Sequence, residues 1–282
     1  GLNEICLSSR QTASSSSFRI VYDFYSERDW ESTLFTFDTE ELEFLDVSTS
    51  SRGEASMLLS FKNWESLHFL EHVDDGTATG IWADNILSTS LLNSTSFAFA
   101  GTSSGRPIVL STEGGHALKM QTTSSYTAVE QSILTSGTMG ALLGSSLDSE
   151  GHQHLAHATS AVGGYQIFAS IEDDSGWTTS QVATDLDLSD PLIVLTDMSD
   201  ETSILYRDST ENQLMMSHYA SGWTAAMIGL PGEVVSSDFP AMHLPNGEVA
   251  LALISDDGQN QNLSVWMYDG ATVESSPIAG LT

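Results

Sequence analysis

The chain has 282 residues, with 38 acidic side chains against 8 Lys or Arg and a formal charge of −30. A field of this sign repels nucleic-acid phosphates and anionic lipid, so we exclude nucleic acid as a partner and expect no membrane insertion. The apolar fraction of 40% allows a folded core, and the single cysteine, Cys6, excludes an internal disulfide.

The start of the chain, Gly1-Leu2-Asn3-Glu4, lacks the basic and apolar regions of a signal peptide. We expect a mature chain or one cut from a longer precursor, extracellular or displayed at a cell surface, and acting as a monomer or as part of a larger chain. The acidity suits a secreted protein kept soluble by charge. It equally suits a marine or halophilic source, because salt screens the self-repulsion.

Short apolar segments that close with Ser, Asp, Asn or Gly turns recur about every 47 residues, the length of a four-stranded propeller blade. The sequence therefore predicts an all-β fold, a six-bladed β-propeller of four-stranded antiparallel blades that forms a single domain. The blades are expected at about 1–46, 47–93, 94–138, 139–189, 190–237 and 238–282.

The residues from 126 to 134 are ambiguous, because Thr127 and Glu130 have the spacing of a helix capping box; a short helix there is the alternative to an outer strand.

The clearest strand patterns lie in the part of the chain that follows this segment. Strands are predicted at 141–146, 153–159, 165–171, 178–183, 192–196, 203–207, 214–219, 224–228, 241–244, 249–254, 263–268 and 272–277. Within 263–268, Leu263, Val265 and Met267 alternate with Ser264, Trp266 and Tyr268, which is the period of a strand.

Two motifs carry a resemblance to known proteins. Residues 148–157, DSEGHQHLAH, resemble the blade pattern of secreted microbial propellers, in which an Asp-x-x-Gly turn leads into a His-apolar-Ala-aromatic strand. The Ser-Gly-Trp-Thr strings at 175–178 and 221–224 are similar to the turn before the outer strand of those blades. Propeller lectins and sialidase-like repeat proteins have similar blades. The resemblance covers residues 140–282 and implies architecture, because such propellers bind sugars, bind proteins or carry enzymes.

In a propeller, the loops from second to third strands, and from fourth strands to the next blade, share one face, where ligands usually bind. Aromatic rings beside polar side chains suit a sugar. The candidate ligand-binding residues in these loops are Arg28, Trp30, Lys62, Trp64, His116, Tyr165, Asp208 and Asp256. Trp30 and Trp64 are either stacking platforms or packing residues between blades. Trp177 and Trp223 recur at one blade position and are expected to be structural.

Three carboxylates, Asp185, Asp187 and Asp190, form a candidate site for a structural Ca²⁺ ion, which needs oxygen ligands. A solvated acidic loop is the alternative, because the glycine and terminal glutamate of an EF-hand are missing. His152 and His154 should lie on one side of a strand, but the sequence offers no third ligand for a shared metal. We predict no other cofactor.

The sequence has no His-Glu-x-x-His motif, no glycine-rich phosphate loop ahead of a helix and no setting for a cysteine nucleophile. We therefore predict a non-enzymatic binding module that recognises a glycan or a protein partner on one propeller face. One alternative is a polysaccharide hydrolase or lyase that uses His116, Tyr165 and His243 for acid or base chemistry. The other is a structural module of a larger surface protein.

Overall fold

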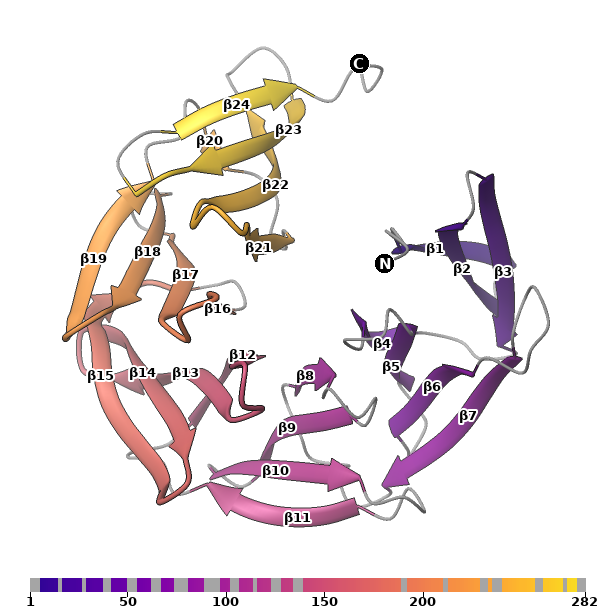
Figure 1. Ribbon diagram of the computed structural model, residues 1–282, viewed down its shortest axis with the longest axis horizontal. Coiled ribbons are helices and arrows are strands. Elements are labelled where there is room, and N and C mark those ends of the chain that lie inside the picture. The colour runs from indigo at the N-terminus through magenta and orange to yellow at the C-terminus, as the bar shows by residue number, and fades with distance from the viewer. Residues whose placement is uncertain are drawn as a thin grey trace. The chain divides into compact units, whose positions relative to one another are not determined.

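The computed structural model (Figure 1) describes the backbone of the strands given below and of the turns between them from residue 139 onward, apart from short gaps. Side chains are described for 57–59, 68–70, 144–188, 192–209, 213–228, 240–254, 263–270 and 274. The chain divides into two compact units, residues 1–114 with 118–132 and residues 115–117 with 133–282. No helix that could span a membrane occurs among the described residues.

The first unit consists of antiparallel sheets whose strands follow one another in chain order, with β10 and β11 crossing its boundary. The strands are β1 (Cys6–Ser14), β2 (Ser17–Ser26), β3 (Asp29–Phe37), β4 (Leu42–Thr49), β5 (Ala55–Phe61), β6 (Leu67–Val73), β7 (Ile81–Ser88), β8 (Phe97–Gly101), β9 (Pro107–Glu113), β10 (His116–Thr122) and β11 (Ala128–Ile133). Three successive residues of β5, Met57, Leu58 and Leu59, are fully buried, so both faces of the β4–β7 sheet are covered.

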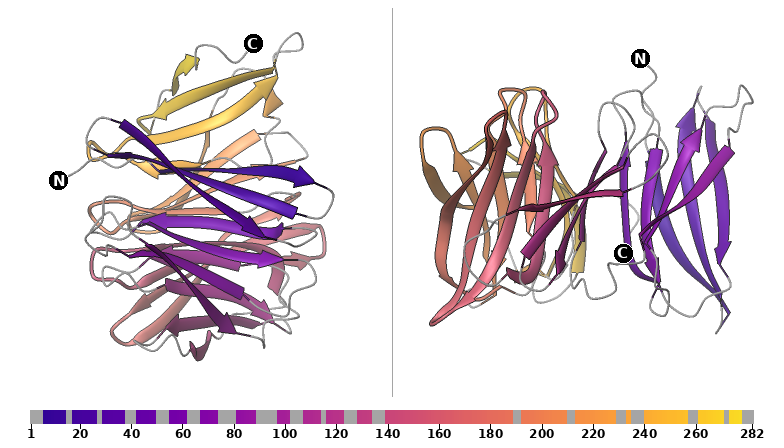
Figure 2. Two further views of the ribbon diagram at one scale, coloured as in Figure 1. Left: turned by 90° about the vertical axis from the view of Figure 1, so that its right-hand side faces the viewer. Right: turned by 90° about the horizontal axis from the view of Figure 1, so that it is seen from below.

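The second unit holds three more antiparallel sheets, and Figure 2 shows their strands from two further sides. The strands are β12 (Met139–Leu147), β13 (Gln153–Ala161), β14 (Gly164–Asp173), β15 (Gly176–Leu186), β16 (Ile193–Thr196), β17 (Thr202–Asp208), β18 (Gln213–Tyr219), β19 (Trp223–Ile228), β20 (Glu233–Val234), β21 (Ala241–His243), β22 (Val249–Asp256), β23 (Gln261–Tyr268) and β24 (Val273–Pro277). The first strands of adjacent sheets, β12, β16 and β21, are neighbours.

The last sheet has a broken edge strand. Both β20 and β21 pair with β22, at Glu233↔Asp256 and at Ala241↔Leu251 respectively. Pro240 stands immediately before β21, and its carbonyl still accepts a hydrogen bond from the nitrogen of Ala252 (3.1 Å). A proline lacks the N–H that a continuous ladder requires, which is why it is tolerated at the start of an edge strand.

The core of the second unit lies between sheets. Along β17, Ile204 and Tyr206 pack with Val194 and with Ala156 of the preceding sheet, whereas Leu205 packs with Leu251 of the following one. This alternation places both faces of the β16–β19 sheet against a neighbour. At the first strands the approach is close enough that a Cβ at Gly144 would lie 2.1 Å from the carbonyl oxygen of Leu192.

The prediction of an all-β fold is confirmed, and four of the six sheets among the described residues have four antiparallel strands, the others having three and five. Every strand predicted between residues 141 and 277 is present, with ends that differ by a few residues. Residues 128–133 form a strand, so the helix considered for this stretch does not occur. In β23, Ser264, Trp266 and Tyr268 are buried while the alternate positions are half-buried, as the period-two pattern indicated.

Candidate functional site

A tight turn joins β12 to β13, and Asp148 organises it. Its Oδ1 accepts hydrogen bonds from the backbone nitrogens of Glu150 (3.0 Å) and His152 (2.8 Å), and its own nitrogen donates to the carbonyl of His152 (3.0 Å). Gly151 takes a φ of 88°, a conformation that glycine adopts without a steric penalty. The Asp-x-x-Gly motif therefore encodes a closed loop that holds His152 at the start of β13.

The turn from β16 to β17 repeats this design one sheet later. Asp197 Oδ1 accepts from the nitrogens of Ser199 (2.8 Å) and Glu201 (2.9 Å), as Asp148 does in its own turn. Asp200 stands in the place of the glycine, with a φ of 62°. Its carboxylate crosses to the neighbouring turn and accepts from the nitrogen (2.7 Å) and hydroxyl (2.8 Å) of Ser149. The two turns are thereby joined.

A third turn, between β14 and β15, lies at the same end of the sheet. Asp173 Oδ1 accepts hydrogen bonds from the nitrogen (2.7 Å) and the hydroxyl (2.6 Å) of Ser175. These bonds lower the pKa of Asp173, so the group is ionised at neutral pH. Asp174, the next residue, is fully exposed at the tip of the hairpin.

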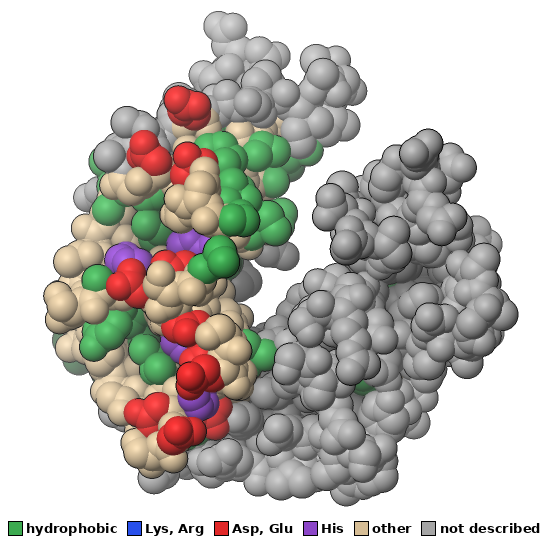
Figure 3. Space-filling model, in the orientation of Figure 1, with side chains coloured by type: hydrophobic (Ala, Val, Ile, Leu, Met, Phe, Trp, Pro, Cys, Tyr) green, Lys and Arg blue, Asp and Glu red, His purple; other side chains and the backbone are tan. Residues whose placement is uncertain are grey.

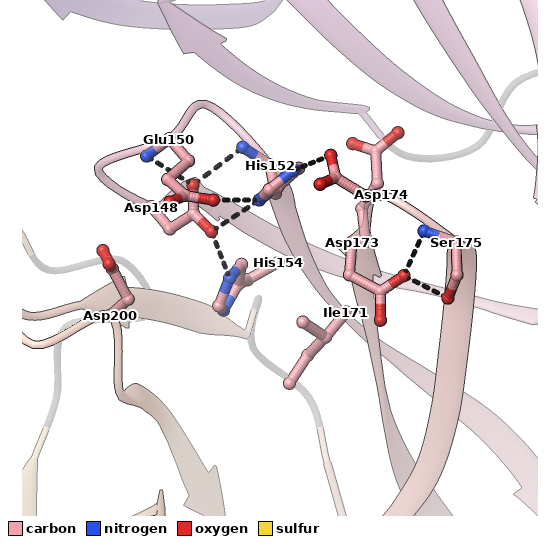
Figure 4. Close-up of a pocket in the computed structure, with 10 residues that line it drawn as sticks. Asp148, Glu150, His152, His154, Ile171, Asp173, Asp174, Ser175 and Asp200 are labelled. Carbon is pink, nitrogen blue, oxygen red and sulfur yellow. Dashed lines mark hydrogen bonds and ion pairs between the residues drawn. The ribbon is translucent and has the colours of Figure 1, made fainter.

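Together the three turns surround an open pocket with a volume of about 510 Å³, inside the range of small-ligand sites. Six carboxylates, two imidazoles, one hydroxyl and one aliphatic side chain line it. The lining residues are Asp148, Glu150, His152, His154, Ile171, Glu172, Asp173, Asp174, Ser175 and Asp200 (Figure 4). Histidine and acidic side chains also gather on the face of the second unit that Figure 3 shows.

His152 lies among three carboxylates. Its Nδ1 is 3.1 Å from Asp148 Oδ2 and 3.7 Å from Glu150 Oε2, and its Nε2 is 3.5 Å from Asp174 Oδ1. The hydrogen bond to Asp148, supported by Asp174, raises the pKa of His152 above its ordinary value. Burial pushes the pKa of Asp148 upward, but the hydrogen bonds from His152 outweigh it and the pKa is lowered. The pair therefore stays ionic up to a pH above the ordinary pKa of a histidine side chain.

His154 differs from His152 because it is only 3% exposed. Its Nδ1 hydrogen-bonds with the hydroxyl of Thr202 on the next sheet (2.5 Å), and its Nε2 is 3.6 Å from Asp148 Oδ2. Burial lowers the pKa of His154 in spite of the nearby carboxylate. The two histidines of the pocket are therefore shifted in opposite directions, His152 toward its charged form and His154 toward its neutral form.

The β16–β19 sheet has a hydrogen-bonded Ser–His–Glu chain beside the Asp197 turn. Ser203 Oγ hydrogen-bonds with His218 Nδ1 (3.0 Å), and His218 Nε2 is 3.2 Å from Glu201 Oε2. The arrangement resembles the order of a nucleophile, a base and an orienting acid. Ser203 is 0% exposed, however, so its hydroxyl is out of reach of a substrate, and the chain stabilises the sheet.

The residues Gly101-Thr102-Ser103-Ser104-Gly105 match the Gly-x-Ser-x-Gly pattern of a hydrolase nucleophile elbow. That elbow joins a strand to a helix. Here Gly101 ends β8 and pairs with Pro107, the first residue of β9, so the string connects two antiparallel strands. The structural context of a nucleophile is missing.

None of the predicted ligand-binding residues whose side chains are described lies at this pocket, and the side chains of the others are not described. Arg28, Lys62 and Trp64 fall outside the described residues, whereas Trp30 in β3, His116 in β10 and Asp256 in β22 have a described backbone only. Tyr165 and Asp208 are half-buried beside the turns that follow β13 and β17. They lie at the opposite ends of their sheets from the pocket, and Tyr165 is about 20 Å along β14 from Ile171, which lines the pocket.

The residues considered for acid and base chemistry are also separated. His243 ends β21 at the pocket end of its sheet, whereas Tyr165 lies at the other end of β14. Burial lowers the pKa of His243, and neither of its ring nitrogens has a hydrogen-bond partner among the described residues. The structure does not bring Tyr165 and His243 into one site.

Two of the three predicted calcium ligands are described. Asp185 and Asp187 are exposed, and Asp185 takes a φ of 59° while its Oδ2 accepts from the hydroxyl of Thr184 (3.1 Å). Asp190 lies outside the described residues. Within the part of the chain that the structure describes, no three His, Cys, Asp or Glu side chains converge as a metal site.

Two of the expectations for tryptophan and histidine can be followed in the structure. Trp223 packs on the preceding sheet, where its Nε1 donates to Ser180 Oγ (2.9 Å). His152 and His154 do lie on one side, since both rings approach the same oxygen of Asp148. The acidic partners that make this a pocket were missed, and the Asp-x-x-Gly-His string was the signal that could have located it.

No protein-family model matches the sequence, and no curated protein matches it. Solved structures do. A lectin of Aleuria aurantia in complex with α-methyl-L-fucoside is 12% identical, with a TM-score of 0.57, over 98% of this chain and 95% of that one. The lectin SapL1 in complex with α-methyl fucoside is 11% identical, with a TM-score of 0.57, over 98% and 97%.

A Hadza microbial sialidase, Hz136, is 9% identical, with a TM-score of 0.59, over 94% of this chain and 67% of that one. The chain is therefore similar over nearly its whole length to β-propeller lectins and to a sialidase, as the blade motifs implied. At these identities the likeness shows the fold alone.

Proposed function

We propose that the chain is a glycan-binding module outside the cell or on its surface, and that the pocket between the β12–β13 and β14–β15 turns is a sugar-binding site. The observation that carries the proposal is the open pocket, where carboxylate and imidazole groups lie beside the aliphatic side chain of Ile171. Sugar recognition combines such directed polar groups with a small apolar surface. The two fucoside-binding lectins with the same fold support this choice.

The proposal includes six blades of about 47 residues. Asp148, Asp197 and Leu244 open equivalent turns in successive sheets, and they follow one another at intervals of 49 and 47 residues. The described residues form six sheets, in agreement with one sheet per repeat. In the last sheet, β20 and β21 together take the place of one first strand.

The charge of the pocket indicates which glycans fit. Asp173 has its pKa lowered and is ionised, and Asp148 is ionised for the same reason. Carboxylates accept hydrogen bonds from sugar hydroxyls, but they repel sulfate, uronate and sialate groups. We therefore propose a neutral glycan as the ligand, in contrast to the anionic chains on which a polysaccharide lyase of uronates would act.

A glycan array with neutral, amino, uronic and sulfated members tests the proposal, at low and high salt and with and without Ca²⁺. The expected result is binding to one class of neutral glycan. Ser175→Trp, at the pocket rim, should abolish that binding by filling the space, while Tyr165→Phe, at the far end of the same sheet, should leave it unchanged. Each variant should keep the wild-type circular dichroism spectrum.

Two outcomes count against this site. Binding that survives Ser175→Trp and is lost in Trp30→Ala or Trp64→Ala would place the ligand on the face that the sequence favoured. Silence across the array, together with release of product from the same glycans in solution, would favour an enzyme instead.

A further inference from the structure

The turns on the two sides of the pocket lie beyond the last ladder pair of β13 and β14, His154↔Ile171. One link between them there is the hydrogen bond from the nitrogen of Gln153 to Glu172 Oε2 (3.2 Å). A second link is the ring of His152, whose Nδ1 lies 3.1 Å from Asp148 on its own turn and whose Nε2 lies 3.5 Å from Asp174 on the opposite turn. Figure 4 shows the ring between the two carboxylates.

Nearly every group that faces His152 is acidic. Its own turn supplies Asp148 and Glu150, the opposite turn supplies Asp173 and Asp174, β14 supplies Glu172, and the neighbouring sheet supplies Asp200. The remaining imidazole, His154 on β13, is shifted toward its neutral form because burial lowers its pKa. A charged His152 is thus the one cation among the residues that line the pocket, and without it the opposing carboxylates repel one another.

We propose that His152 is a proton-operated clasp that holds the β12–β13 and β14–β15 turns together across the pocket and so fixes the shape of the site. The clasp rests on the proposed function, since it regulates the same pocket. When the ring carries both protons it donates to Asp148 on one side and to Asp174 on the other. A neutral ring has one proton and can donate to one carboxylate only, so the link across the pocket is lost.

The pH range over which the clasp is closed follows from the directions in which the pKa values of His152 and Asp148 are shifted. Asp148 and Asp174 raise the pKa of His152, so the ring stays protonated up to a pH above its ordinary value of 6.5. At the acid end, the pKa of Asp148 is below its ordinary value of 3.8. The clasp is therefore closed at mildly acidic pH, and it opens as the pH rises through the folded-state pKa of His152, which lies above 6.5.

Hydrogen exchange of the ligand-free protein tests the clasp without any glycan. Exchange of the amides at 149–152 and 174–176 would be followed from pH 5.5 to 9 and corrected for the intrinsic rate at each pH. In the wild type, protection of both turns should fall roughly two- to fivefold across the titration of His152, the size expected of a partly exposed ion pair. His152→Gln should have low protection at every pH.

Two variants with the same change in charge distinguish a direct link between the turns from a general electrostatic effect of the acidic pocket. Asp174→Asn and Glu150→Gln each remove one carboxylate within 4 Å of the ring, at 3.5 and 3.7 Å. Only Asp174 belongs to the opposite turn, so Asp174→Asn should abolish the pH dependence of protection and Glu150→Gln should keep it. Equal loss in the two variants, or a wild type without pH dependence, overturns the clasp. A silent glycan array leaves this measurement unaffected.

Discussion

The carboxylate of Asp200 accepts both hydrogen bonds that Ser149 donates, one from its backbone nitrogen at 2.7 Å and one from its hydroxyl at 2.8 Å. The two residues are 51 positions apart and belong to the turns of adjacent sheets. Asp200 holds a φ of 62°, which favours glycine, and Gly151 fills the equivalent place in the preceding turn. An unfavourable backbone conformation is thus offset by a link between sheets.

This balance predicts an order of stability among variants of Asp200. Asp200→Ala loses both hydrogen bonds and keeps a Cβ in the left-handed region, so we expect a loss of about 1 to 2 kcal/mol. Asp200→Gly loses the same bonds but relieves the backbone, and should be less destabilised. Urea unfolding of the two variants checks the order. A glycine variant as unstable as the alanine variant would show that φ carries no penalty here.

A second prediction concerns the close approach of first strands at Gly144. A Cβ there would lie 2.1 Å from the carbonyl oxygen of Leu192, which is backbone and cannot move aside cheaply. Gly144→Ala should therefore lower stability by about 1 to 3 kcal/mol or more, as overpacking of a tight interior does. Thermal unfolding measures the loss.

Ser145→Ala is the matched control for that experiment. Its Oγ is buried and has no hydrogen-bond partner in the described part of the chain, so its removal leaves no polar group there unsatisfied. We expect this variant to be neutral or slightly stabilised. If Gly144→Ala were as stable as Ser145→Ala, the sheets would not be in contact through the backbone at this point.

A structural feature could be predicted from the sequence where the residues that determine it are close together along the chain. Strands such as β13 and β23 follow from period-two alternation and from Asp and Gly turns, which are local properties. The Asp148 turn could be anticipated in the same way. These elements were therefore predicted with ends within a few residues of those observed.

The pocket could not be predicted by such local reasoning. Asp200 is 51 residues from its partner Ser149, and Asp174 comes from a different hairpin from His152. Only the packing of adjacent sheets brings them together, and a sequence of 38 acidic residues gives no reason to select these. Reasoning from propeller topology also favoured the opposite ends of the sheets, where Tyr165 and Asp208 lie.

The role of Trp223 leads to a third prediction. Its Nε1 donates to Ser180 Oγ (2.9 Å) on the preceding sheet, and its ring lies 5.2 Å from that of Tyr219, centre to centre. Trp223→Phe keeps an aromatic ring but loses the hydrogen bond, which should cost about 1 kcal/mol. In a double-mutant cycle with Ser180→Ala, we expect a coupling of about 0.5 to 1.5 kcal/mol. A coupling of zero would contradict a shared hydrogen bond.

The last prediction concerns pH and His157, which is 0% exposed and stacks on Phe168 with ring centres 5.6 Å apart. Burial lowers the pKa of His157 to about 4. The unfolded chain, with an ordinary pKa near 6.5, therefore binds more protons than the folded chain between about pH 4 and 6.5. Stability must fall as the pH is lowered through this window, and the full shift amounts to about 3 kcal/mol.

His157→Phe isolates this contribution, because it keeps an aromatic ring against Phe168 and removes the titrating group. The difference in unfolding free energy between the variant and the wild type should be constant above pH 7. It should move in favour of the variant by up to about 3 kcal/mol between pH 6.5 and 4. His154 and His243, whose pKa values burial also lowers, titrate in both proteins and cancel in the difference. A difference that does not change with pH would mean that His157 accepts a proton in the folded state as readily as in the unfolded chain.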